Sequence, residues 1–190
     1  GNDGNAILNI LGGTPPYIET WGTSNPLNLT AGGHTYIVND DNGCNNTGSI
    51  IITEPSQILV SYISTNALCN GVNDGTAILN ISGGVSPYNE NWGTNNPLAL
   101  SAGTHVFIIT DTNGCILTDS VLITQPNQMN VIVDTFRVSC SGLSDGSASL
   151  NISGGTAPYI ENWGVNNPMA LNVGTYSFTV TDSNNCLFQG

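Results

Sequence analysis

The sequence has very few charged residues, and almost all of them are acidic. Charged residues make up 7% of the 190 residues, with 13 acids and a single Lys or Arg, Arg137; the usual charged share is roughly 25%. The formal net charge is −12. Without a basic surface the chain cannot displace counterions from nucleic acid or dock on anionic lipid. We therefore expect no nucleic-acid partner.

Long apolar runs are missing as well. The chain has no run of ~18 apolar residues, so we expect no direct membrane insertion. Hydrophobic residues still make up 39%, which is enough for packed cores and excludes the composition of a disordered chain. Gly (23), Pro (9) and Asn (27) are abundant. Such a turn-rich, lysine-free composition favours an extracellular all-β protein.

What the sequence does contain is an internal repeat. Trp21, Trp92 and Trp163 are spaced 71 residues apart, and the same shift aligns Asp-Gly, Gly-Gly-x-x-Pro-Tyr, Asn-Pro and Cys positions. Residues 74–115 and 145–186 are identical at 27 of 42 positions without a gap. We predict repeat one at 1–55, repeat two at 56–126 and repeat three at 127–190. Only repeat two is complete at this spacing, so we expect a stretch of a longer tandem array.

Within each repeat the apolar residues alternate with a period of two, and no segment has a convincing helical period. In repeat two Ala77, Leu79 and Ile81 should share one face of a strand. We expect six short strands there, separated by turn dipeptides, at 58–64, 76–82, 88–92, 97–100, 105–110 and 120–124. This pattern predicts a small β-sandwich. The repeats would be linked head to tail through hinges at Pro55 and Pro126.

Five cysteines occupy two positions of the repeat. Cys69 and Cys140 share the first position, and Cys44, Cys115 and Cys186 share the second. One scheme pairs them within a repeat, as Cys69–Cys115 and Cys140–Cys186, and places the partner of Cys44 outside the printed sequence. The other scheme joins successive repeats through Cys44–Cys69 and Cys115–Cys140. Either scheme needs an oxidising compartment, so we expect the protein outside the cytoplasm.

The combined motif resembles the SprB repeat of gliding Bacteroidota. The resemblance rests on the segments Cys69–Gly75, Gly83–Tyr88, Ala102–Phe107, Thr110–Cys115 and Ile123–Pro126, together with Trp92. It implies an immunoglobulin-like or PKD-like sandwich. It also implies a large cell-surface protein that is exported by type IX secretion and used in adhesion and gliding, without catalytic residues.

The aromatic residues have two interpretations. One Trp per repeat (Trp21, Trp92, Trp163) could stack on a sugar, but a core position in a small sandwich is the favoured interpretation. If the array is instead a carbohydrate-binding adhesin, the candidate exposed column is Tyr17, Tyr88 and Tyr159.

The acidic residues of the turns are candidate calcium ligands. Asp40, Asp41, Asp111 and Asp182 each lie one or two residues from an Asn, and Asp3, Asp74 and Asp145 precede Gly. Calcium prefers such oxygen ligands. The same residues are ordinary turn formers, which is the favoured interpretation. No zinc site is expected, because there is no Cys-x-x-Cys motif. No cofactor is expected apart from this structural calcium.

Glycosylation is a further hypothesis. Four asparagines lie in N-x-[ST] motifs, namely Asn28, Asn45, Asn80 and Asn151, and Ser120 lies in an Asp-Ser-aliphatic motif. Sugars would help a chain with so few charges to stay soluble.

Catalytic patterns are absent from the sequence. There is no Gly-x-Ser-x-Gly motif, and Tyr176 replaces His34 and His105 in repeat three, which argues against a shared histidine chemistry. We read the histidines as strand-edge residues. We expect a non-enzymatic structural repeat of a cell-surface filament or stalk, with neighbouring repeats as its partners. The alternatives are an adhesin that binds surface glycans, or accessory repeats of a secreted enzyme.

Overall fold

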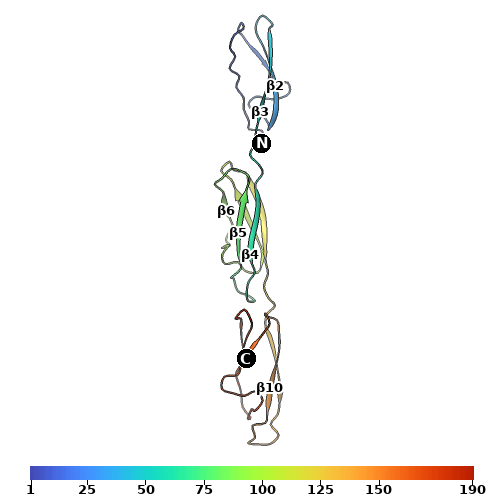
Figure 1. Cartoon of the computed structure of the whole chain (residues 1–190), viewed down its shortest axis with the longest axis vertical. Helices are drawn as coiled ribbons and strands as arrows, with labels where there is room; N and C mark the ends of the chain where they lie inside the picture. Colours follow the sequence, from blue (N-terminus) through green and yellow to red (C-terminus); the bar gives the residue numbers. More distant parts are fainter. The chain divides into compact units, whose positions relative to one another are not determined.

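The computed structural model describes residues 1–190 and contains thirteen β-strands and no helix (Figure 1). The strands form five small sheets, and every strand pair is antiparallel. No helix is long and apolar enough to cross a membrane. The all-β sandwich fold predicted from the sequence is confirmed.

Repeat two has the most complete sandwich. One sheet pairs β4 (Leu59–Thr65) with β5 (Thr76–Ser82). The other has the order β6-β7-β8, from β6 (Asn89–Asn91), β7 (Gly103–Thr110) and β8 (Ile116–Ile123). The alternation in β5 points Ala77, Leu79 and Ile81 towards the core, as the sequence predicts.

The core of repeat two lies between these two sheets. The indole of Trp92 packs against Phe107, with ring centroids 4.9 Å apart. Phe107, Ile109 and Val121 have no exposed surface. Burial of apolar side chains at ~25 cal/mol per Å² is the main stabilising term for such a small sandwich.

Repeat three repeats this arrangement with shorter strands. The pair β9 (Asn130–Phe136) and β10 (Ser147–Ser153) forms one sheet. The other has the order β11-β12-β13, from β11 (Ile160–Asn162), β12 (Thr179–Thr181) and β13 (Leu187–Gln189). β12 pairs with three residues of β13, whereas β7 pairs with eight residues of β8.

Residues 1–57 form a separate compact unit from residues 58–190. The first unit has a single sheet of β1 (Ile18–Thr20), β2 (Gly32–Asn39) and β3 (Asn45–Ile52). Its residues 5–11 align with β5 but form no strand.

One expected strand is not formed. Residues 97–100 form a turn, in which Asn96 Oδ1 accepts a hydrogen bond from the amide of Leu98 at 3.0 Å. Only Leu100 makes an isolated bridge, to Gly75. The sequence interpretation failed here because the side-chain bond of Asn96 satisfies the local backbone in place of a strand partner. The repeat boundaries and the 71-residue length stay predictions.

Candidate functional site

Asp111 organises one end of the sandwich of repeat two. Its carboxylate accepts hydrogen bonds from the amides of Cys115 at 2.8 Å, Asn113 at 2.9 Å and Val85 at 3.0 Å. A Cβ on Gly84, which has φ +57°, would lie 2.9 Å from Asp111 Oδ2. Glycine is therefore required where the Gly-Gly turn approaches this carboxylate.

Hydrogen bonds lower the pKa of three of the turn aspartates, Asp40, Asp111 and Asp145. Desolvation raises the pKa of Asp111, but the amides of Cys115, Val85 and Asn113 outweigh it, so the pKa lies below its ordinary value. The amides of Thr14 and Cys44 likewise lower the pKa of Asp40. Asp145 differs, because the hydroxyl of Ser139 is the main group that lowers its pKa.

Asp40 and Asp182 lie at the positions aligned with Asp111, and Asp182 repeats its three amide bonds whereas Asp40 has two of them. Asp40 bonds the amides of Thr14 and Cys44, and Asp182 bonds those of Thr156, Asn184 and Cys186. The carboxylates face backbone donors, which is the geometry of the turn interpretation. Asp41 is exposed, and the chain brings together no group of three or more His, Cys, Asp or Glu side chains that could hold a metal ion. Calcium binding stays a prediction.

The cysteine that follows this turn takes part in a bond between two repeats. Cys69 of repeat two and Cys186 of repeat three form a disulfide across 117 residues, with their Cα atoms 5.6 Å apart. Beside it, the Asn184 side chain donates to the Leu68 carbonyl at 2.9 Å. The Asn70 side chain donates to the carbonyl of Pro126 at 3.0 Å. The loop that carries Cys69 is thus held both to repeat three and to the hinge proline.

This bond corrects the expected disulfide pairing. Cys115 and Cys140 are exposed free thiols, as is Cys44, so neither Cys69–Cys115 nor Cys140–Cys186 is formed, and neither is Cys44–Cys69 nor Cys115–Cys140.

Strand length explains why the within-repeat scheme fails. Cys115 immediately precedes β8, whereas the loop of Cys69 lies where that strand ends, with the Ala67 amide bonded to the Thr124 carbonyl. Eight residues of strand span about 26 Å, whereas bonded cysteines need Cα atoms within about 7 Å.

The three tryptophans are all buried, with 6% to 7% of their surface exposed. Each packs against an aromatic residue of the neighbouring strand or its flank: Trp21 on Tyr36, Trp92 on Phe107 and Trp163 on Phe178. Their rings are therefore placed in the cores and not on a sugar-stacking surface.

The tyrosine column is also tied to the fold. The hydroxyls of Tyr17, Tyr88 and Tyr159 donate to the carbonyls of Gly12, Gly83 and Gly154, five residues earlier. All three rings are half-buried. Each tyrosine closes the Gly-Gly turn, so only part of its ring is available to a ligand.

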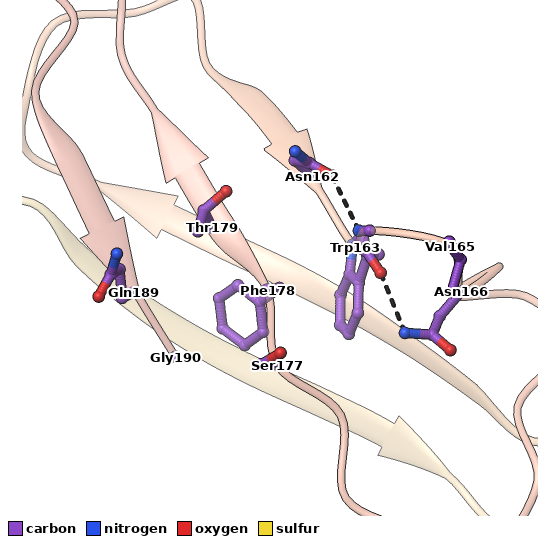
Figure 2. A pocket seen from close by; sticks show the side chains of 10 residues that line it. Asn162, Trp163, Val165, Asn166, Ser177, Phe178, Thr179, Gln189 and Gly190 are labelled. Atoms are coloured by element: carbon purple, nitrogen blue, oxygen red, sulfur yellow. Dashed lines mark hydrogen bonds between the residues drawn. The ribbon is translucent and has the colours of Figure 1, made fainter.

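A concavity with a volume of about 670 Å³ lies beside Trp163. Figure 2 shows the rings of Trp163 and Phe178 next to each other, with Asn166 donating to the Trp163 carbonyl at 3.1 Å. In repeat two the corresponding space holds the end of β8, where Val121 and Ile123 are buried. The concavity therefore marks the place of a strand of the sandwich, and we assign it no ligand.

The candidate sugar acceptors lie on the surface. Asn28, Asn45, Asn80 and Asn151 are exposed, and Ser120 is half-buried. The Asn151 side chain bonds to Asp134 across the β9–β10 pair at 2.5 Å. The structure thus leaves the asparagines sterically open to modification, which stays a prediction.

Both histidines lie near the start of a strand, His34 in β2 and His105 in β7. His105 is buried, and its Nε2 lies 2.8 Å from the Ser101 carbonyl. The role of His105 is to close the turn that precedes β7, a contact between side chain and backbone that the alternation of the strand does not reveal.

Comparison with known families agrees with this repeated architecture. A model of the SprB repeat matches residues 61–95 and again residues 137–160. The chain contains SprB repeats. The two stretches overlap when repeat two is aligned on repeat three, and both include the first cysteine position. The search of curated proteins and the search of solved structures each gave no match. SprB repeats are structural repeats of cell-surface proteins of the gliding and adhesion type.

Proposed function

We propose that this chain is a non-enzymatic structural segment of a secreted bacterial cell-surface filament or stalk. The observation that carries the proposal is the junction of repeats two and three. There the disulfide Cys69–Cys186 and the bond from Asn184 to the Leu68 carbonyl join two sandwiches. A binding or catalytic module does not need a covalent link to its neighbour, whereas a load-bearing segment gains from one.

The composition supports the same function. A lone Arg137 and no lysine leave almost no sites for trypsin-like proteases, which suits a surface exposed to its surroundings. A disulfide persists in an oxidising compartment, in agreement with a location outside the cytoplasm. Type IX secretion and a role in adhesion or gliding are part of this proposal and rest on the SprB repeats.

The proposed function can be tested by immunogold electron microscopy of intact cells of the source organism. Antibodies raised against residues 58–190 should label thin surface filaments along their length. Preadsorption of the antibodies with the same polypeptide is the control and should abolish the label. Label confined to filament tips would favour the glycan-binding adhesin instead, and label only inside opened cells would contradict the proposal.

A further inference from the structure

We propose that the cysteine pair of this repeat is an attachment device between consecutive repeats. In this device the first cysteine of one repeat bonds to the second cysteine of the repeat that follows it. Cys69–Cys186 is one such bond. Cys140 is then the attachment site for a following copy of the same repeat. The inference concerns how repeats are joined and does not rest on the proposed function.

The free Cys140 has the same backbone surroundings as the bonded Cys69. In the loop of Cys69, the Leu68 amide bonds to Asp74 Oδ1 at 3.1 Å, and the Val72 amide lies 3.5 Å from the Cys69 carbonyl. In the loop of Cys140 the aligned bonds run from the amide of Ser139 to Asp145 at 3.0 Å and from Leu143 to the Cys140 carbonyl at 3.2 Å. The loop of Cys140 therefore has the same two backbone hydrogen bonds as the loop of the bonded Cys69.

At the second cysteine position, the bonded Cys186 and the free Cys115 make the same backbone hydrogen bond. The amide of Cys186 bonds to Asp182 Oδ1 at 2.9 Å, and that of Cys115 bonds to Asp111 Oδ1 at 2.8 Å. Cys115 is exposed, whereas Cys186 is half-buried against repeat two. Each repeat therefore presents one cysteine forward and one backward.

The partner that fits Cys140 is another copy of this repeat. At the bonded junction Asn184 contributes a side-chain amide that the Leu68 carbonyl accepts. Ser139 aligns with Leu68, so its carbonyl is the corresponding acceptor on the loop of Cys140. The donor position of Asn184 is occupied by Asn113 in repeat two. An incoming repeat would bring its own Asn at this position, so one polar contact accompanies the covalent bond.

Formation of the bond requires an oxidant. The two thiols lose two protons and two electrons to a disulfide such as oxidised glutathione, which leaves as two thiols. The reaction proceeds by attack of one thiolate on the oxidant, followed by attack of the second thiolate on the mixed disulfide. In a chain with many repeats every junction would be bridged in this way. Each repeat would then carry one disulfide to the repeat before it and one to the repeat after it.

The test extends the full chain by one repeat length. A copy of residues 120–190 is added after Gly190, and two changes are made in the copy alone. Asn185→Gly gives the peptides around its Cys186 a distinct mass, and Gly114 already occupies the aligned position in repeat two. Cys140→Ser in the copy ensures that every Cys140 peptide comes from the original repeat three. The protein is refolded in a glutathione redox buffer, alkylated without reduction, digested with pepsin and mapped by mass spectrometry. Pepsin is suitable because it needs no basic residue and works at a pH where disulfides do not exchange.

The expected result is a Cys140 peptide linked to the marked copy of the Cys186 peptide in most molecules. The Cys69–Cys186 linkage in the same sample reports that the sandwiches have folded. A second sample with Cys140→Ser also in the original repeat three should leave the marked cysteine alkylated. The proposal is overturned if Cys69–Cys186 forms while Cys140 stays alkylated, or if Cys140 bonds to the unmarked Cys186. It is equally overturned if neither bond forms, since the pairing rule then fails at both junctions.

Discussion

His105 Nε2 lies 2.8 Å from the carbonyl oxygen of Ser101, four residues earlier, and the imidazole is buried. In repeat three the hydroxyl of Tyr176 donates to the carbonyl of Asn172 at 3.1 Å, at the aligned positions. Two different side chains therefore close the same turn. The contact, and not the chemistry of the imidazole, is what this position of the repeat requires.

This relationship predicts unequal effects of two substitutions at His105. His105→Ala leaves the Ser101 carbonyl without its partner and should lower the free energy of unfolding by about 1–3 kcal/mol. His105→Tyr should cost less, because Tyr176 already makes the bond in repeat three. Urea unfolding followed by tryptophan fluorescence measures both. Equal losses for the two variants would contradict the role assigned to the contact.

Reduction of the disulfide should increase the contour length of the chain that can be extended by force. With Cys69–Cys186 intact, the chain between the cysteines, whose sequence separation is 117, is shielded from stretching. Single-molecule pulling in the presence of a reductant should therefore release about 400 Å of additional contour length, at up to 3.6 Å per residue.

A matched control for the pulling experiment is the variant Cys69→Ser. It should show the long contour length with or without reductant. A wild-type contour length that does not change on reduction would mean that the bond is absent in solution.

The stability of the chain should fall in acid, and Asp111 should account for part of the fall. Its pKa is lower in the folded chain than the ordinary 3.8, so the folded state binds fewer protons than the unfolded state in that range. The stabilisation is complete above the unfolded pKa and is lost as the pH falls through the folded pKa, roughly between pH 5 and pH 2.

The variant Asp111→Asn tests this assignment. It should lower the melting temperature at pH 7 by several degrees and flatten its dependence on pH between about 5 and 2. The control is Asp119→Asn on β8, whose carboxylate accepts only from the adjacent Ser120 amide. An unchanged pH dependence in Asp111→Asn would show that other acids carry the acid sensitivity.

The core of repeat two should respond to truncation on one face of β7 only. Phe107 has no exposed surface and packs on Trp92, whereas its neighbour Val106 is 52% exposed. Phe107→Ala should cost about 3–5 kcal/mol, and Val106→Ala should stay within about 0.5 kcal/mol. Urea unfolding of the two variants measures the difference. Similar losses would mean that the outward face of β7 is also packed.

Much of each sandwich could be predicted from the sequence because its signals are local. The alternation in 76–82 fixes which side of the strand is apolar, and it correctly placed Ala77, Leu79 and Ile81 in the core. The turn residues are equally local, since an aspartate that bonds amides two and four residues ahead acts within its own loop. The failure at 97–100 arose because Asn96 satisfies the backbone there with its side chain.

The sequence by itself determined an all-β chain of similar repeats that share one tryptophan position, one tyrosine position and two cysteine positions. Only the tertiary structure decided which cysteines meet. Cys115 and Cys69 belong to one repeat, yet a strand of eight residues separates their loops. Cys69 and Cys186 are 117 residues apart, yet their Cα atoms lie 5.6 Å from each other. A disulfide depends on distance in space, and the length of the strands sets that distance, so spacing along the sequence could not reveal it.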